Sequence, residues 1–159
     1  MANIITLLKV EEGRKLVPYL CTEGYPTIGD GFRIGPKGAP LEHYQFRLTH
    51  AICDTWLTSL IEQTLSAMER HPLICNALAN CNDARRAVLV SMAYQMGVTG
   101  LANFKMMLNA VAGDRWPDAA IEMMDSTWAL QTPNRAKRHQ QQMLSGQWLA
   151  QYEGHSHVG

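Results

Sequence analysis

The stretch EEGRKLVPYLCTEGYPTIGDGF, from Glu11 to Phe32, holds a helix end, a tight turn and three reactive side chains. Just before it, apolar residues recur at helical spacing behind Asn3, which is a good N-cap residue. Gly13 is typical of a left-handed helix stop, so we expect the helix to end at Glu12. Partial negative charge from the peptide dipoles there favours a protonated carboxyl group. Glu12 is therefore a candidate general acid.

The residues that follow predict a β-hairpin. Leu16–Cys21 and Tyr25–Phe32 are rich in aliphatic and aromatic residues, and they flank Thr22-Glu23-Gly24, which is typical of a turn. With the glycine at the centre of the turn, Cys21 lies directly opposite Thr27, and their Cβ atoms are about 5 Å apart. A thiol and a hydroxyl group would then share one face of the sheet.

Strand alternation assigns the next residues to the two faces of this sheet. Gly29 and Gly31 fall on the Cys21 face and leave it open to a ligand, whereas Asp30 points the other way. We therefore do not count Asp30 among the candidate catalytic residues. Taken singly, Glu12, Cys21 and Thr27 could also be an exposed helix-end charge, a small buried residue and an ordinary strand residue.

Together, these three residues form a recognisable motif. Glu12, eight residues, Cys21, five residues and Thr27, arranged around TEGYPTIG, resemble the catalytic motif of the phage-type lysozymes, glycoside hydrolase family 24. Two later stretches, RRAVLVSMAYQMG (Arg85–Gly97) and QTPNRAKR (Gln131–Arg138), are also similar to that family. The resemblance covers nearly the whole chain and implies that Glu12, Cys21 and Thr27 are catalytic.

Cys21 stands where the family usually has aspartate, with cysteine as a variant. A free thiol has a pKa of about 8.5 and is mostly neutral at pH 7. Two interpretations remain open: a thiolate with a lowered pKa, or a neutral thiol that leaves room for a water molecule bound by Thr27.

The resemblance also implies a fold and a binding groove. The expected fold is α+β and lysozyme-like: a small mixed α/β lobe with a short antiparallel sheet, a long connecting helix and a larger all-helical C-terminal lobe. Gly31, Tyr94 and Gln95 match positions that bind substrate in the family's groove, and Arg135 would support the site by reaching back to Glu12. From the residues alone, Tyr94 could instead fill the core, and Arg135 could belong to a solvated helix face or an ordinary ion pair.

The rest of the chain predicts a single domain, residues 1–159, with two sub-lobes. These are residues 13–55 for the small lobe, residues 1–12 with 72–159 for the helical lobe, and residues 49–71 for the helix that connects them. Thr49 is a plausible N-cap for that helix, and Thr132 precedes Pro133 in the same way near the C-terminus. The helices expected in the larger lobe span residues 73–79, 84–96, 102–111, 117–124 and 133–144.

Composition restricts the class of partner. The chain has 159 residues, 47% of them hydrophobic, and its 14 basic and 14 acidic residues cancel. This balance gives no overall field for binding nucleic acid or a membrane. No apolar run reaches the roughly twenty residues of a spanning helix, and no signal peptide is evident. We expect a monomer.

Cysteine and histidine patterns predict neither a metal site nor a cofactor. The four cysteines should be free thiols in a reducing compartment, and their spacing does not suggest zinc. His155 and His157 lie in a polar C-terminal tail that we expect to fray rather than to bind metal.

The resemblance therefore implies an endolysin. Such a muramidase hydrolyses the β-1,4 bond between N-acetylmuramic acid and N-acetylglucosamine in peptidoglycan, and lyses the host cell. It would be made in the host cytoplasm and reach the wall at lysis, with a holin. Two alternatives are a lytic transglycosylase, in which the sugar's own 6-hydroxyl group displaces the leaving group, and a non-catalytic peptidoglycan-binding module.

Overall fold

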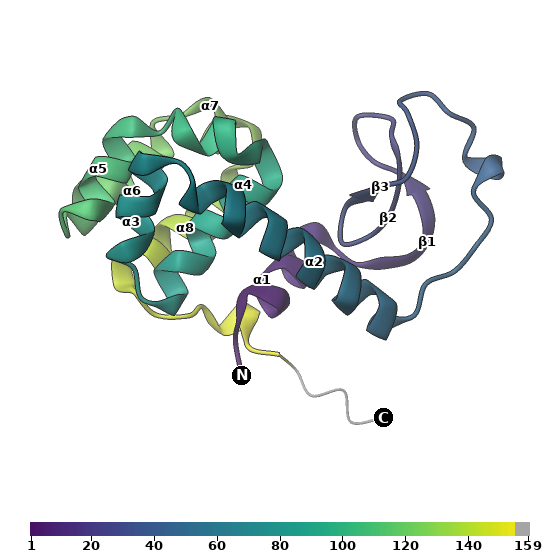
Figure 1. Cartoon of the computed structure of the whole chain (residues 1–159), viewed down its shortest axis with the longest axis horizontal. Coiled ribbons are helices and arrows are strands. Elements are labelled where there is room, and N and C mark those ends of the chain that lie inside the picture. Colours follow the sequence, from purple (N-terminus) through teal and green to yellow (C-terminus); the bar gives the residue numbers. More distant parts are fainter. Residues whose placement is uncertain (155–159) are drawn as a thin grey trace. The chain divides into compact units, whose positions relative to one another are not determined.

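The computed structural model describes residues 1–154 and has two compact units. The smaller unit is Leu8–Leu60, and the larger combines Met1–Leu7 with the chain from Ile61 onward. Both unit boundaries fall inside helices, namely α1 (Ile4–Glu12) and α2 (His50–Glu69). The described chain contains helices and one small antiparallel sheet, so the predicted α+β class is confirmed (Figure 1).

Helix α1 begins and ends where its cap residues predict. The Asn3 side-chain oxygen accepts a hydrogen bond from the Thr6 N–H group at 3.0 Å, and the Thr6 hydroxyl oxygen accepts one from the Asn3 N–H group at 2.9 Å. Gly13 has φ +65°, and its N–H group donates to the Lys9 carbonyl oxygen at 3.1 Å. Glu12 is therefore the last residue of the helix, as predicted.

The sheet has three strands in the order β1 (Lys15–Leu20), β2 (Pro26–Gly29) and β3 (Phe32–Arg33). The second predicted strand, which continued to Phe32, is interrupted by a turn at Asp30 and Gly31. Gly31 has φ +78°, a conformation that a residue with a Cβ atom rarely adopts. This turn separates β2 from β3.

The hairpin register differs from the prediction. Thr27 lies opposite Tyr19 rather than opposite Cys21. The turn type explains the difference, because the Cys21 N–H group donates to the Tyr25 carbonyl oxygen at 3.0 Å and Gly24 has φ +85°. Gly24 is thus the last residue of a three-residue turn and not its centre. A register change of two residues leaves the faces unchanged, so Cys21 and Thr27 still share one.

A buried ion pair lies beneath this turn. The Asp30 carboxylate accepts hydrogen bonds from Arg14 Nη2 at 2.6 Å and from Arg14 Nε at 2.9 Å. The Asp30 side chain is 0% exposed and that of Arg14 is 7% exposed. Arg14 also contacts Asp54 at 2.8 Å. Burial disfavours the guanidinium charge, but the hydrogen bonds and charges of the two aspartates raise the pKa of Arg14 above its ordinary value.

The predicted long helix is confirmed as α2. The Thr49 hydroxyl oxygen accepts a hydrogen bond from the Ile52 N–H group at 3.2 Å, as expected of an N-cap. Between the sheet and α2, the connector contains only the short 3-10 helix η1 (Leu41–His43). The rings of Phe32 and Trp56 stack with their centroids 4.4 Å apart, so the first part of α2 packs against β3.

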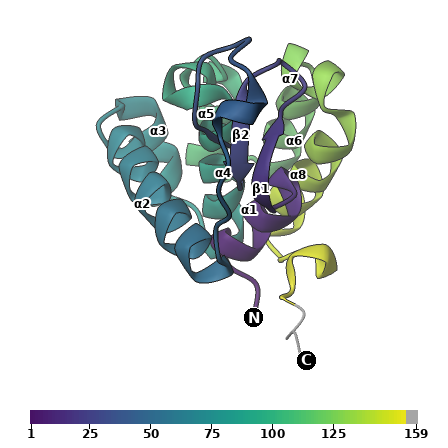
Figure 2. The ribbon, with the colours of Figure 1, turned by 90° about the vertical axis from the view of Figure 1, so that its right-hand side faces the viewer.

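The larger unit is helical and centred on α4 (Asp83–Ala102), in which residues 87–93 are all buried. Figure 2 shows α3 (Pro72–Ala79) and α8 (Pro133–Ser145) on either side of α4. The predicted helix ends at Met96, whereas α4 continues beyond a break at Gly97, where φ is +82°.

A short helix that we did not predict, α7 (Thr127–Gln131), follows α6 (Trp116–Met124). The larger unit also contains α5 (Lys105–Ala112) and the 3-10 helix η2 (Ala150–Tyr152).

Helix α8 begins where predicted, but its cap differs. Pro133 occupies the first turn and Thr132 the N-cap position. The Thr132 hydroxyl group donates to the Trp128 carbonyl oxygen at 3.0 Å instead of capping α8. The preceding helix α7 therefore uses this hydroxyl group.

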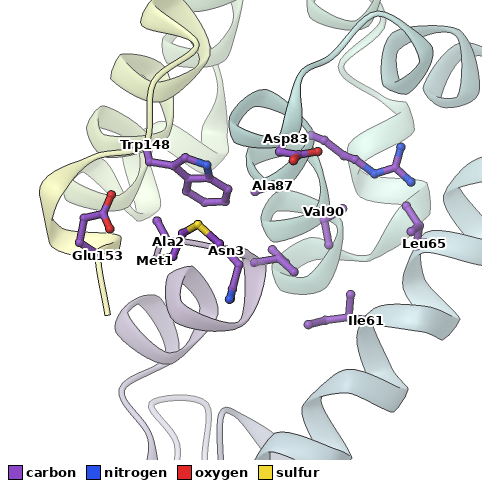
Figure 3. A pocket seen from close by; sticks show the side chains of 12 residues that line it. Met1, Ala2, Asn3, Ile61, Leu65, Asp83, Ala87, Val90, Trp148 and Glu153 are labelled. Carbon is purple, nitrogen blue, oxygen red and sulfur yellow. The ribbon is translucent and has the colours of Figure 1, made fainter. Parts of the chain in front are cut away.

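A cavity of about 490 Å³ opens in the larger unit beside the N-terminal residues and α4. Its lining is mostly apolar, with Ala2, Val90 and Trp148 among the contributors, and the carboxylates of Asp83 and Glu153 also border it (Figure 3). No residue predicted to be functional belongs to this lining.

No single helix among residues 1–154 is long and apolar enough to cross a membrane. Only α4 and α5 taken together, which are bent by 103° at their junction, reach that length and hydropathy.

All four cysteines are free, as predicted. His155 and His157 lie outside the described residues.

We expect that breaking the buried pair destabilises the smaller unit far more than breaking an exposed pair does. Asp30→Ala leaves the buried Arg14 guanidinium group with a large part of its charge uncompensated, and should lower the free energy of unfolding by roughly 3–5 kcal/mol. Glu23→Gln breaks the exposed Arg33–Glu23 pair, whose atoms are 2.8 Å apart, and is the matched control. It should lower this free energy by no more than about 1 kcal/mol.

Urea unfolding of the two variants measures this difference. Similar small losses in both variants would contradict a special role for the buried pair.

Candidate functional site

Glu12 lies against the backbone of the turn between β2 and β3. A Cβ atom placed on Gly31 would be 2.8 Å from Glu12 Oε2, so a side chain at position 31 would collide with the carboxyl group. The buried pair holds both ends of this contact, because Arg14 follows Glu12 by two residues and Asp30 directly precedes Gly31. The fold therefore fixes the carboxyl group at the turn.

The sheet face beside Glu12 carries a row of polar side chains. Thr27 on β2 lies opposite Tyr19 on β1 and opposite Arg33 on β3. Directly opposed residues on neighbouring strands project to the same side of a sheet, and so do residues two apart on one strand. Tyr19, Thr27 and Arg33 thus form a row across the sheet, with Cys21 at its edge.

Polar groups of the turn lie beside the Cys21 sulfur. The Tyr25 N–H group donates to Cys21 Sγ at 3.4 Å. The Thr27 hydroxyl group, which donates to the Tyr25 carbonyl oxygen at 2.8 Å, also lies beside the sulfur. Partial burial would raise the pKa of Cys21, but the N–H groups of Tyr25 and Glu23, the Thr27 hydroxyl group and the Arg33 charge lower it below its ordinary value.

The charges of both Glu12 and Cys21 act on Tyr19. Its pKa is raised first by burial and then by the negative charges of Glu12, Cys21 and Asp30. Both Glu12 and Cys21 are thus close enough to the Tyr19 hydroxyl group for their charges to act on it. The smaller unit therefore gathers Glu12, Cys21, Thr27 and Gly31 in one region.

The other two predicted groove residues belong to the larger unit. Tyr94 is half-buried and Gln95 is exposed, near the end of the continuous part of α4. The Trp128 indole N–H group donates to Gln95 Oε1 at 2.8 Å, so the Gln95 amide group is oriented by α7. Their role in substrate binding stays a prediction.

Arg135 is a buried residue of the first turn of α8. Its Nη2 atom donates to Ser91 Oγ at 2.9 Å and, at 3.4 Å, to the Ser91 carbonyl oxygen. Because Ser91 belongs to α4, this contact joins α8 to the central helix of the larger unit. The predicted contact between Arg135 and Glu12 stays a prediction.

Sequence reasoning missed the Arg14–Asp30 pair and the place of Arg33 in the site. Arg14 and Asp30 are sixteen residues apart, and only the turn conformations bring them together. Arg33 lies beyond the motif that drew attention to Cys21, although its odd number and its place on a strand could have assigned it to the same face.

Residues 1–154 offer no metal centre: within that range, no three His, Cys, Asp or Glu side chains lie where they could hold an ion.

The sequence is similar to proteins of one known family. Residues 9–143 match the phage lysozyme family. The chain is 34% identical over 155 residues to probable T4-type lysozyme 1 of Dictyostelium discoideum, covering 87% of this chain and 91% of that protein. It is also 33% identical over 161 residues to the pre-baseplate central spike protein Gp5 of Enterobacteria phage T4, covering 91% of this chain and 28% of that protein.

Proposed function

Because this chain belongs to the phage lysozyme family and is a lysozyme-type glycosidase of peptidoglycan, we propose that it acts as an endolysin that opens the host wall at lysis. Its relatives include a Dictyostelium discoideum protein and a phage spike protein, so family membership does not define the biological role. We propose that Glu12, Cys21 and Thr27 catalyse hydrolysis of the β-1,4 bond between N-acetylmuramic acid and N-acetylglucosamine. The observation that carries this assignment is that the Glu12 carboxyl group lies against Gly31 in the turn after β2, while Thr27 on β2 shares a sheet face with Cys21.

In this mechanism Glu12 is the general acid. It donates its proton to the glycosidic oxygen as the bond from that oxygen to the anomeric carbon breaks. Two features support this role: the end of α1, where the helix dipole disfavours a carboxylate, and the close approach of Gly31, which fixes the carboxyl group. A fixed carboxyl group needs little reorganisation to reach the leaving oxygen.

Cys21 and Thr27 act on the sugar that carries the anomeric carbon. We propose that the Cys21 thiolate stabilises the positive charge that develops at the anomeric carbon, while the Thr27 hydroxyl group holds the attacking water. The water oxygen forms the new bond to carbon, and the thiolate accepts the proton that water loses. Proton exchange with solvent then restores the acid at Glu12 and the thiolate at Cys21. The donors around the sulfur support this interpretation over a neutral spacer.

Two alternatives give different products. A lytic transglycosylase would use Glu12 but no water, and would leave an anhydromuramic end. A peptidoglycan-binding module would bind purified peptidoglycan without cleaving it. Mass spectrometry of digested peptidoglycan therefore separates all three: we expect reducing ends that have gained one water.

Replacing the acid tests its role directly. Glu12→Gln keeps the shape of the side chain but removes the donated proton, and should lower the cleavage rate by roughly a hundredfold to ten-thousandfold. Glu11→Gln, one position earlier in α1, is the matched control and should keep most of the activity. A folded Glu12→Gln protein that cleaves at nearly the normal rate would exclude Glu12 as the acid.

The Gly31 contact can be tested with two glycines of like conformation. Gly31 and Gly38 have φ of +78° and +83°, but nothing lies within 4 Å of a Cβ atom at Gly38. Each change to alanine should lower the free energy of unfolding by about 1 kcal/mol through backbone strain. Only Gly31→Ala should also displace the Glu12 carboxyl group, with an expected activity loss of about a hundredfold, since misplacement by about 1 Å has such an effect. Equal activities in the two variants would contradict the proposed contact.

The endolysin role is tested in cells. When the protein is made in the cytoplasm of a Gram-negative host, we expect the cells to stay intact until a holin or chloroform permeabilises the inner membrane, and then to lyse. Glu12→Gln protein at the same level is the control. Lysis without permeabilisation, or none after it, would contradict the role.

A further inference from the structure

Arg33 is held in place by the hairpin turn that carries Cys21. Its guanidinium carbon, Cζ, lies 3.9 Å from the centre of the Tyr25 ring, in a cation–π contact. Its Nη2 atom lies 2.8 Å from Glu23 Oε2. Glu23 belongs to the three-residue turn and Tyr25 directly follows it, so the turn fixes the charge from two sides.

The same turn holds the sulfur. The Tyr25 N–H group donates to Cys21 Sγ, and the Cys21 carbonyl oxygen accepts a hydrogen bond from the Gly24 N–H group at 2.9 Å. Tyr25 therefore touches the sulfur through its backbone and the guanidinium group through its ring. Because Arg33 pairs with Thr27, its side chain leaves β3 on the face that Cys21 occupies.

We propose that Arg33 is a positioning residue for the hydrolysis proposed above: held by Tyr25 and Glu23 beside the turn that carries Cys21, its guanidinium group favours the anionic form of the Cys21 sulfur. This proposal rests on the proposed function. A thiol that replaces a carboxylate needs such a group, because a carboxylate is ionised at neutral pH and an ordinary thiol is not.

Three carboxylates also belong to this region. Glu23 pairs with Arg33, and the charges of Glu12 and Asp30, like that of Cys21, act on the neighbouring Tyr19. Arg33 is the positive side chain that lowers the pKa of Cys21.

Lys37 supplies a matched control. It packs beside the turn, where its Cγ atom would be 3.9 Å from a Cβ atom at Gly24. It is not among the groups that shift the pKa of Cys21. Lys37→Met therefore removes a nearby positive charge without removing the one that the proposal requires.

The experiment measures the rate at which iodoacetamide alkylates Cys21 in the full chain from pH 5 to 10, with peptide mass spectrometry as the readout. Cys75, exposed on α3, is an internal reference whose midpoint should be the same in every variant. Arg33→Met should move the Cys21 midpoint upward by about half a pH unit, so that alkylation at pH 7 slows roughly threefold. Arg33→Lys keeps the positive charge, so its Cys21 midpoint should stay close to that of the wild type. In 1 M salt, the difference between the wild type and Arg33→Met should become smaller.

An unchanged midpoint in Arg33→Met, or an equal shift in Lys37→Met, would overturn the proposal. Arg33→Gln serves as a second variant if the methionine variant is unstable, and the same upward shift is expected.

Enzyme kinetics separate this inference from the proposed function. In Arg33→Met, the pH profile of kcat should move upward with the alkylation midpoint, while KM stays nearly constant. If the midpoint moves but the profile of kcat does not, the thiolate has no part in hydrolysis, and the role of Arg33 in it is overturned. If the wild-type chain does not cleave peptidoglycan, the proposed function is contradicted. The alkylation result would still measure the effect of Arg33 on the sulfur.

Discussion

The buried pair of Arg14 and Asp30 fixes the geometry on which the site depends. Arg14 follows the end of α1 and Asp30 occupies the turn after β2, so one ion pair joins the helix that carries Glu12 to the turn that Glu12 touches. Burying two charges has a large desolvation cost, so such a pair contributes little net stability compared with well-packed apolar residues. Its effect here is specificity, because the pair is satisfied only when the helix end and the turn are in this one arrangement.

In the smaller unit, local signals predicted structure well and longer-range pairing less well. The cap at Asn3 and the cap at Thr49 depend on groups three residues away, and both were predicted correctly. The end of α1 at Glu12 depends on the adjacent Gly13 and was also predicted correctly. The hairpin register depends on which residue of the turn takes positive φ, and placing Gly24 at the centre gave the wrong partner for Thr27. The face assignment survived because it depends only on odd and even positions. The Arg14–Asp30 pair could not be predicted, since nothing in either residue's neighbourhood indicates the other.

In the larger unit, apolar periodicity predicted the central helix, while polar contacts between helices were not readable. Ser91 interrupts the apolar surface of α4, and its Oγ atom lies 2.7 Å from His139 Nε2 and 2.9 Å from Arg135 Nη2. The Tyr152 hydroxyl group lies 3.4 Å from the other ring nitrogen of His139. A buried serine without such partners would be costly, so these contacts explain its presence in a core helix. The sequence indicated that Arg135 lies in the first turn of its helix, but it did not indicate that Arg135 binds Ser91.

The break at Gly97 divides α4 into two parts that differ in local stability. Before it, seven successive residues are buried and their amide groups are shielded by neighbouring helices. After it, residues 98–100 are only partly covered or exposed, and the helix continues for little more than one turn. Amide hydrogens in the first part should exchange with solvent only through large-scale unfolding, whereas those beyond Gly97 need only local opening. The single helix α4 therefore contains two regions whose amide hydrogens exchange through different opening events.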